Sequence, residues 1–245
     1  MTLKRKDSSP PSVEASGFGF TPLIVPPEDP AQTYEKVKAE VGVMETARTW
    51  LENIKILGQA NAEYIEGILD AGGTVADIGA GGLISAYDLA EKYGDKGGAV
   101  VAVEPFTPSL IEEVPENMRV VRKLIEEVTD IDIEPNSVDA AYCSNVFGYP
   151  PDKLEFIKGI YRILKVGGSM IIPDKGGATN PALVDIFKMA GLSHLIEMQE
   201  RNALGFGVAV IKKESEQLLN FGEYTFSIAN RGGQETSTTY EFTNE

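Results

Sequence analysis

The sequence predicts an α/β protein: a doubly wound, mostly parallel seven-stranded sheet with a final antiparallel hairpin strand and an N-terminal helical cap. Three observations carry this prediction. Short apolar strands alternate with helical segments between residues 71 and 213, as is typical of parallel strands joined by helices. A glycine-rich turn follows the first strand at residues 79–82. The last two strands are separated by too few residues for a crossover helix, so we expect a hairpin.

We divide the chain into four parts. Residues 1–30 contain six of the 14 prolines, and this composition predicts a flexible arm. Residues 31–70 are expected to form a helical cap, because apolar side chains recur there at helical spacing. This stripe consists of Trp50, Ile54, Leu57, Tyr64 and Ile68. Residues 71–213 form the main domain, and residues 214–245 form an extension that the pattern does not place.

Within the main domain, the apolar pattern predicts each element in turn. The predicted strands cover residues 74–78, 99–104, 119–125, 138–143, 169–173, 194–200 and 208–213. The predicted helices cover residues 83–93, 152–165 and 181–190. Asp152 is expected to cap the second helix, with Glu155 at its third position. Gly167 and Gly168 are expected to end that helix.

Charge and composition exclude several kinds of site and partner. The chain has 245 residues and a formal net charge of −15, a field that repels a phosphate backbone, so we do not expect a nucleic-acid substrate. The single cysteine, Cys143, and the single histidine, His194, provide neither a disulfide nor a paired-cysteine zinc site, and we expect no metal. No apolar run approaches the length of a membrane span. The cytoplasm is the expected location, and the pattern does not indicate an oligomeric state.

The sharpest local signal is the segment VADIGAGG at residues 75–82. A buried strand delivers the Asp77 carboxylate and then a turn in which glycine allows positive φ and close approach of a ligand; a tight turn without a ligand is the alternative. Glu104 ends the next strand, 25 residues after Gly79, where an open α/β sheet binds ligands. The dinucleotide pattern G-x-G-x-x-G is not complete, because Ile84 stands at its third glycine, and no P-loop follows.

Four segments together resemble class I S-adenosylmethionine-dependent methyltransferases. Residues 77–81 (DIGAG) are similar to the family's first motif, and residues 101–105 (VAVEP) are similar to its second. Residues 137–146 (SVDAAYCSNV) resemble the fourth-strand motif of the small-molecule branch, which includes quinone-biosynthesis enzymes. Residues 161–168 (YRILKVGG), followed by an apolar strand, resemble the next motif. The resemblance covers roughly residues 60–213.

This resemblance implies roles for residues along the cofactor, S-adenosylmethionine. Asp77 and the backbone of Gly79 to Gly81 would face its amino-acid half, and Glu104 would hold the ribose hydroxyls. Glu127 would bind the adenine amino group, although Glu126 is one residue away. The full set of implied cofactor residues is Asp77, Gly79, Ala80, Gly81, Glu104, Pro105, Glu127, Val128, Ser144 and Asn145.

The sequence departs from the family's pattern at two places. Leu83 stands where the first motif usually has a third glycine, and Phe147-Gly148-Tyr149 stands where a histidine often follows the fourth-strand motif. The catalytic residues therefore stay unassigned. Asn145, Tyr149 and Asp174 are candidates by position, and for Tyr149 and Asp174 a structural role is favoured. Cys143 is expected to be a core residue, and His194 is expected not to be a catalytic base.

The leading hypothesis is methyl transfer from S-adenosylmethionine to a small organic molecule at an oxygen, nitrogen or carbon atom. Such a transfer from a sulfonium depends mainly on alignment of the reacting atoms, and it needs a base only where the acceptor must lose a proton. One alternative is a methyltransferase-like module that binds or regulates without catalysis. A less favoured alternative is an NAD-dependent oxidoreductase, against which Ile84 speaks.

Overall fold

The computed structural model describes residues 48–106, 109–147, 150, 152–175, 183–184, 187–188, 190–217, 219, 225–229 and 235–239. For residues 174, 175, 225–229 and 235–239 it describes only the backbone. The predicted arm at residues 1–30 and the start of the predicted cap at residues 31–47 lie outside the described residues.

Strands and helices alternate along most of the described chain, as the sequence predicts. The helices are α2 (Trp50–Leu57), α3 (Gln59–Asp70), α4 (Ile84–Tyr93) and α5 (Lys153–Ile163), with short 3-10 helices η2 (Gly94–Lys96), η3 (Ile125–Glu127) and η4 (Ser193–Leu195). The strands of the main sheet are β1 (Thr74–Ile78), β2 (Ala99–Val103), β3 (Met118–Val121), β4 (Val138–Tyr142), β5 (Leu164–Lys175), β6 (Ile196–Gln199) and β7 (Phe206–Lys212). In the predicted extension, β8 (Thr225–Ala229) and β9 (Glu235–Thr239) form a separate antiparallel pair.

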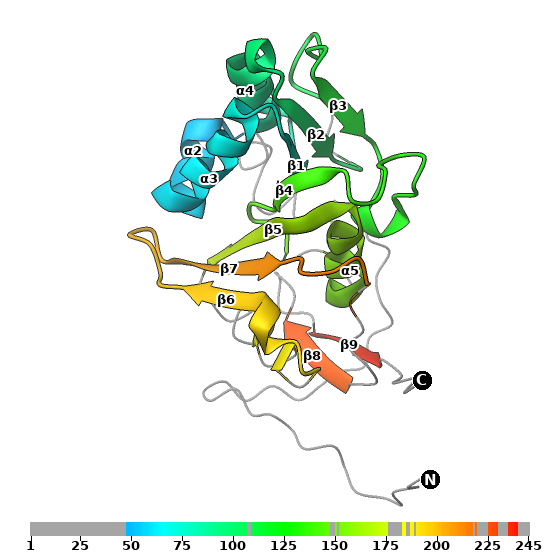
Figure 1. Ribbon diagram of the computed structural model, residues 1–245. Helices are drawn as coiled ribbons and strands as arrows, with labels where there is room; N and C mark the ends of the chain where they lie inside the picture. Colours follow the sequence, from blue (N-terminus) through cyan, green and yellow to red (C-terminus); the bar gives the residue numbers. More distant parts are fainter. Residues whose placement is uncertain are drawn as a thin grey trace, which may run out of the picture.

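The main sheet has seven strands in the order β3-β2-β1-β4-β5-β7-β6 (Figure 1). β1 lies at its centre and pairs in parallel with β2 and β4. β7 is antiparallel to both of its neighbours, β5 and β6, so it runs against the other six strands. The predicted doubly wound sheet with a final hairpin is therefore confirmed.

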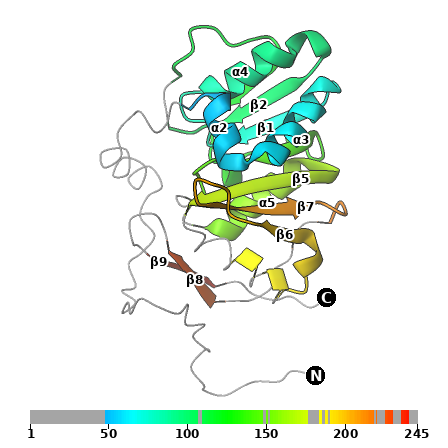
Figure 2. The same ribbon diagram turned by 90° about the vertical axis from the view of Figure 1, so that its left-hand side faces the viewer.

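The two faces of the sheet are covered by different helices. Helices α2, α3 and α4 lie on one face, where Figure 2 shows them in front of the strands, and α5 lies on the other. Each face has its own apolar cluster, one around Ile65, Leu89 and Val75 and the other around Ile157, Val103 and Ile172. Burial on both faces explains why the central strands are nearly continuous apolar runs.

The described part of the N-terminal cap is two helices rather than one. Gly58 has a φ of 85° and separates α2 from α3, and this break resets the helical phase. The predicted stripe holds at Trp50 and Leu57, which are buried, but fails at Tyr64, which is 40% exposed. The buried face of α3 contains Ile65 instead. A single helical period drawn across the glycine produced the error.

Three further predicted boundaries were wrong. The strand predicted at 119–125 ends at Val121, and Ile125 belongs to η3, where it is buried. Helix α5 ends at Ile163 instead of 165, and the strand predicted at 169–173 starts at Leu164. Gly167 lies within this strand at an irregularity in its pairing with β4, and its N–H donates to the carbonyl oxygen of Lys213 at 2.7 Å. Apolar runs alone do not distinguish a strand from the short helix or bulge beside it.

Further predictions concern where individual helices and strands begin and end. Asp152 caps α5 by accepting from the N–H groups of Leu154 and Glu155, as predicted. His194 lies in η4 instead of the predicted strand, and β6 begins two residues later. Of the helix predicted at 181–190, residues 183–184 and 187–188 are helical and most others lie outside the described residues.

No helix in the described ranges is long and apolar enough to cross a membrane.

Candidate functional site

The carboxyl ends of β1, β2 and β4 meet at one edge of the sheet, and most of the predicted cofactor residues lie there. Asp77 is the last but one residue of β1, Glu104 directly follows β2, and Ser144 follows β4 by two residues. These strands are parallel neighbours, so the sheet brings the three side chains together. In open α/β sheets this edge is the place where ligands bind.

The turn between β1 and α4 has a backbone that favours glycine. Gly79 and Gly81 have φ values of 73° and 56°, and a side chain at Gly79 would collide with Val146. The N–H groups of Gly79 and Ala80 donate to the carbonyl oxygen of Val103 at 2.7 and 3.2 Å. These two donors are therefore bonded inside the protein, and they fix the turn to the end of β2.

Leu83 completes this turn in the left-handed conformation, with a φ of 71°. This conformation costs a residue with a side chain about 1–2 kcal/mol. Its side chain is fully buried and belongs to the apolar cluster beneath α2, α3 and α4, and this burial offsets the cost. Leu83 thus keeps the backbone shape that a third glycine would adopt, and its side chain packs under the helix.

The Glu104 carboxylate is held by two backbone donors. Its Oε2 accepts from the N–H of Gly81 at 2.9 Å, and its Oε1 accepts from the N–H of Phe106 at 2.9 Å. The side chain is buried, and Pro105 beside it is half-buried. The carboxylate is therefore fixed at the carboxyl edge, between the glycine-rich turn and the loop that follows β2.

The carboxyl group of Asp77 is buried, and its pKa is raised to about 7. Burial is the largest cause, because removal from water disfavours the charged form. Tyr142 opposes this rise in pKa with a hydrogen bond to the carboxylate. The charge of Glu104 raises the pKa further, and that of Arg48 lowers it. A carboxyl group so balanced changes its charge near neutral pH, and a cation bound beside it would favour the charged form.

Two neighbouring acids in the loop after β3 differ in burial. Glu127, the predicted adenine-side residue, is exposed, whereas Glu126 is half-buried. Within the described residues, the buried Oε2 of Glu126 has no hydrogen-bond partner. The pKa of Glu126 is raised to about 7, chiefly by burial. A hydrogen bond from its own backbone N–H lowers the pKa, and the charges of Asp152 and Glu127 raise it. Glu126 thus suits a ligand-facing role better than Glu127.

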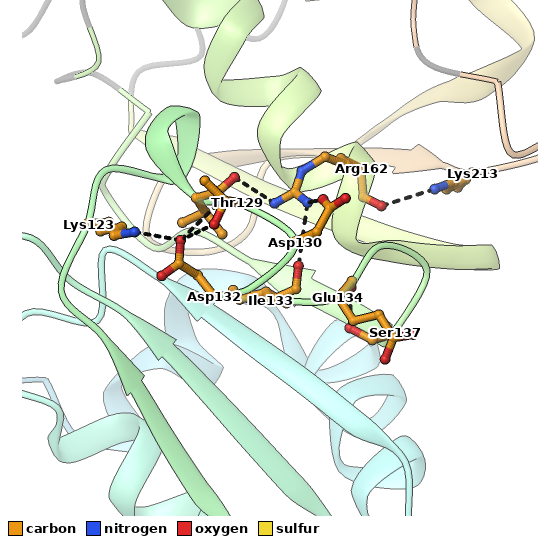
Figure 3. A network of polar contacts seen from close by, with 10 residues as sticks. Lys123, Thr129, Asp130, Asp132, Ile133, Glu134, Ser137, Arg162 and Lys213 are labelled. Carbon is orange, nitrogen blue, oxygen red and sulfur yellow. Dashed lines mark hydrogen bonds and ion pairs between the residues drawn. The ribbon is translucent and has the colours of Figure 1, made fainter.

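The same loop is anchored to α5 by Arg162 (Figure 3). Its Nη2 donates to the carbonyl oxygen of Val128 at 2.8 Å, and its Nη1 donates to that of Ile133 at 3.4 Å and pairs with the Asp130 carboxylate. The side chain of Val128 is buried. Arg162 therefore sets the position of a predicted cofactor residue from the far side of the loop.

A second contact within this loop involves Asp132. Its Oδ2 accepts from the Nζ of Lys123 at 2.7 Å and from the N–H and hydroxyl of Thr129 at 2.9 and 2.8 Å (Figure 3). The Lys123 ammonium and the Thr129 donors hold the pKa of Asp132 well below its usual value. The loop thus holds its shape without help from a ligand.

The segment after β4 contains the remaining predicted residues. Ser144 is buried, and Asn145 is half-buried with a φ of 59°. Such a backbone at an asparagine is uncommon and is often found at functional positions. Asp174 lies near the carboxyl end of β5, where its backbone pairs with Gly207. The side chain of Asp174 and all of Tyr149 lie outside what the structure describes.

Three buried side-chain atoms have no hydrogen-bond partner within the described residues: Asn53 Oδ1, Glu126 Oε2 and Ser144 Oγ. Glu126 and Ser144 follow the carboxyl ends of β3 and β4. Asn53, on α2, donates to Ser85 in the first turn of α4. Buried polar atoms are nearly always bonded, so the atoms of Glu126 and Ser144 at this edge, without a partner among the described residues, indicate a polar ligand.

Comparison with known families agrees with this geometry. Residues 76–172, fewer than half of the chain, match a family described as a methyltransferase domain. The central part of the chain is a methyltransferase domain. Its cofactor is S-adenosylmethionine, as predicted. None of the curated proteins matches the sequence.

The chain is similar to solved structures of methyltransferases. The 1,6-didemethyltoxoflavin-N1-methyltransferase of Burkholderia thailandensis, with bound 1,6-didemethyltoxoflavin and S-adenosylhomocysteine, has a TM-score of 0.53 at 16% identity, covering 79% of this chain and 94% of that chain. A SAM-dependent methyltransferase of Aquifex aeolicus has a TM-score of 0.48 at 18% identity, covering 75% and 98%. At this identity the first likeness shows a shared fold and leaves the acceptor unspecified.

The residues at the edge fit the cofactor, whose ends carry an amino acid and an adenosine. Acidic oxygens at Asp77, Glu104 and Glu126 can accept from its ammonium, hydroxyl and amino groups. The Ser144 hydroxyl, which has no hydrogen-bond partner within the described residues, lies among the strand ends that would flank the cofactor. Within the described residues, no cluster of histidine, cysteine, aspartate and glutamate could hold a metal ion.

Sequence reasoning missed three buried polar residues on one face of the sheet. Asn53, Ser85 and Tyr142 are buried and hydrogen-bonded to one another on the face covered by α2, α3 and α4. Tyr142 was considered only as part of the fourth-strand motif, and Asn53 was not among the residues of the predicted apolar stripe. One signal was available, since a polar residue on a strand buried on both faces needs a partner.

Proposed function

We propose that this protein transfers the methyl group of S-adenosylmethionine to a small organic molecule at an oxygen, nitrogen or carbon atom. The observation that carries the proposal is that buried oxygens of Glu126 and Ser144, at the carboxyl edge of a methyltransferase domain, have no hydrogen-bond partner within the described residues. The quinone-biosynthesis-like branch and the expected cytoplasmic location remain predictions within this proposal.

Each acidic residue of the edge would bind one part of the cofactor. Asp77 would face the ammonium of the amino-acid half. Burial and the charge of Glu104 disfavour its charged form, and a bound cation would stabilise that form. Glu104, fixed by two backbone N–H groups, would accept from the ribose hydroxyls. We assign the adenine amino group to Glu126 in place of Glu127, because its buried Oε2 has no partner within the described residues.

The chemistry that the cofactor supplies is an activated methyl group on a sulfonium. The chain's own contribution would be to hold the acceptor in line with that group and to exclude water. Asn145 and Ser144 lie where the acceptor would approach, beyond the end of β4. A base is needed only for an acceptor that must lose a proton, and Tyr149 and Asp174 remain candidates for that role.

The net charge of the chain and the position of helix α2 both favour a small acceptor over nucleic acid. The net charge of −15 repels a phosphate backbone. Helix α2 contacts α4 and the sheet through Trp50, whose N–H donates to Asp88 and whose ring lies 5.6 Å from that of Tyr142. This helix narrows access to the carboxyl edge, which suits a compact acceptor better than a polymer.

The two alternative functions find less support. A module that has lost its cofactor was suggested by Leu83, but this residue preserves the left-handed turn and packs in the core. An NAD-dependent oxidoreductase is disfavoured by the match to a methyltransferase domain and by β7 lying between β5 and β6.

The test is transfer of label from methyl-labelled S-adenosylmethionine. The full chain is incubated with fractionated small-molecule extracts and, separately, with purified RNA. We expect label to enter one or more small molecules, and Gly79→Ala, which forces a side chain against Val146, to reduce the incorporation. Label in RNA alone would overturn the small-molecule proposal. Binding of the cofactor without transfer to any fraction would favour the non-catalytic module.

A further inference from the structure

Asp77 and Tyr142 are direct neighbours in the sheet. Asp77 on β1 is aligned with Tyr142, the last residue of β4, in the parallel register. Side chains of residues aligned in this way lie on the same face, here the one covered by α2, α3 and α4. The Tyr142 side chain is fully buried and its ring packs against that of Trp50 on α2. The hydroxyl of Tyr142 is therefore held beside the Asp77 carboxyl group.

The hydrogen bonds around Tyr142 have one consistent direction. When Asp77 is ionised its carboxylate only accepts, so in that state Tyr142 donates its single proton to Asp77. The Tyr142 oxygen, 3.1 Å from Ser85 Oγ, must then accept from the Ser85 hydroxyl. Ser85 Oγ in turn accepts from Nδ2 of Asn53 at 2.8 Å. Four buried groups thus form a donor relay that starts on α2 and ends at Asp77.

The charged groups facing this relay come from three directions. Glu104 at the end of β2 and Arg48, just before α2, act on Asp77 with opposite signs. Asp88 on α4 acts on Tyr142. Burial and these acids disfavour a charged Asp77, so the hydroxyl of Tyr142 is the neutral group that stabilises the charged form.

We propose that Tyr142 is a positioning residue for S-adenosylmethionine, which holds the Asp77 carboxylate toward the cofactor's ammonium through the donor relay from Asn53. This inference rests on the proposed function, because it assigns the ammonium to Asp77. Ser85 and Asn53 fix the direction of the Tyr142 proton. Docking of α2 and binding of the cofactor are coupled through the same relay.

Loss of the Tyr142 hydroxyl has a consequence that depends on pH. Without its donor, Asp77 ionises at a higher pH, and a smaller fraction of the protein is ready to bind an ammonium. A hydrogen bond to a charged group corresponds to a shift of about one pH unit. We therefore expect cofactor affinity to fall about tenfold at pH 6 and about threefold at pH 7.5 in Tyr142→Phe.

The experiment is calorimetric titration of S-adenosylmethionine into the full chain between pH 5.5 and 7.5. The cofactor's ammonium is protonated at pH 5.5 and partly deprotonated at pH 7.5, to the same extent for every variant, so the ratio of affinities is unaffected. Tyr142→Phe is compared with wild type and with Tyr161→Phe, a matched loss of a buried tyrosine hydroxyl bonded to the backbone of Glu214 and Ser215. Ser85→Ala, one step along the relay, provides a second variant if Tyr142→Phe does not fold. Methylthioadenosine, which lacks the amino-acid half, is the second probe.

The expected result has three parts. Tyr142→Phe binds S-adenosylmethionine more weakly, by a factor that narrows as pH rises; Ser85→Ala shows a smaller shift of the same sign; and both bind methylthioadenosine as wild type does. A constant loss at every pH, or a wild-type profile in both variants, would overturn the positioning role and leave the proposed function standing. Absence of S-adenosylmethionine binding by wild type at every pH would overturn both.

Discussion

Asp77 and Lys213 are both buried charged residues, but they lie at opposite edges of the sheet and are satisfied very differently. Lys213 is 2% exposed at the amino edge, and its Nζ donates to Asn136 Oδ1 at 2.6 Å and to the carbonyl oxygens of Tyr161 and Arg162 at 2.9 and 3.4 Å. Asp77 is 3% exposed at the carboxyl edge, and the hydroxyl of Tyr142 donates to its carboxylate.

The difference separates a structural charge from a binding charge. A lysine has three donors, and Lys213 uses them on Asn136 and on two carbonyl oxygens at the end of α5, so it needs no ligand. Asp77 has two carboxylate oxygens and a negative neighbour in Glu104, and it lies at the same edge as Ser144, whose Oγ has no hydrogen-bond partner within the described residues. Burial alone therefore does not indicate function, whereas incomplete satisfaction of a buried group does.

The largest effect on stability is expected from Lys213→Met. Methionine keeps much of the apolar stem but leaves three acceptors, two of them at the end of α5, without their donor, a loss of roughly 3 kcal/mol. The melting temperature should fall by roughly 6–12 °C. Lys212→Met is the control, since Lys212 is 55% exposed and its replacement should cost less than about 0.5 kcal/mol. Equal melting temperatures for the two variants would show that Lys213 is not a structural anchor.

In contrast to Lys213→Met, Asp77→Asn should weaken cofactor binding and raise the stability of the protein. Burial raises the pKa of Asp77 from 3.8 to about 7, so between these pH values the native protein holds a proton that the unfolded chain has released. Wild-type stability from this group therefore falls as pH rises through that window, by about 1.4 kcal/mol per unit, and is constant above it.

Asparagine carries no charge and removes this dependence. Asp77→Asn should raise the melting temperature more at pH 8 than at pH 5, and it should weaken S-adenosylmethionine binding at both. Thermal melts and titrations at the two pH values provide the measurement. A variant destabilised equally at pH 5 and pH 8 would place Asp77 with Lys213, among the structural charges.

The smallest effect is expected from His194→Asn. The imidazole is 58% exposed, lies 3.8 Å from Glu214 and precedes β6, which runs parallel to β1 and so has its amino end away from the carboxyl edge. The change should leave the turnover number within a factor of about two and stability within about 0.5 kcal/mol. A hundredfold loss in a folded variant, the scale of losing a general base, would show that the carboxyl edge is not the reactive one.

The sequence was sufficient for the fold because alternating apolar strands and helices admit few topologies. It placed Asp77 and Glu104 at the carboxyl edge of the sheet, where the structure has them, since both lie at or next to the ends of apolar strands. It did not predict the break at Gly58, because one glycine can lie inside a helix or end it. The resulting phase error assigned Tyr64 to the buried face of α3 and missed Ile65.

The polar relay was beyond sequence reasoning for a physical reason. The contact between Asp77 and Tyr142 depends on the register of β1 against β4, and no turn links these strands directly to fix that register. The choice between Glu126 and Glu127 depends on how η3 presents two adjacent side chains, which composition does not encode. The left-handed conformation of Leu83 is unusual for its residue type and gave no sequence signal.

The most direct test of a cofactor site at the carboxyl edge is calorimetric titration of S-adenosylmethionine and S-adenosylhomocysteine into wild type and Glu104→Ala. Both ligands should bind wild type, and the variant should bind each more weakly by about 1–3 kcal/mol, the scale of lost hydrogen bonds to a charged group. Equal affinities in the two proteins, or no binding by wild type, would contradict the assignment of this edge to the cofactor.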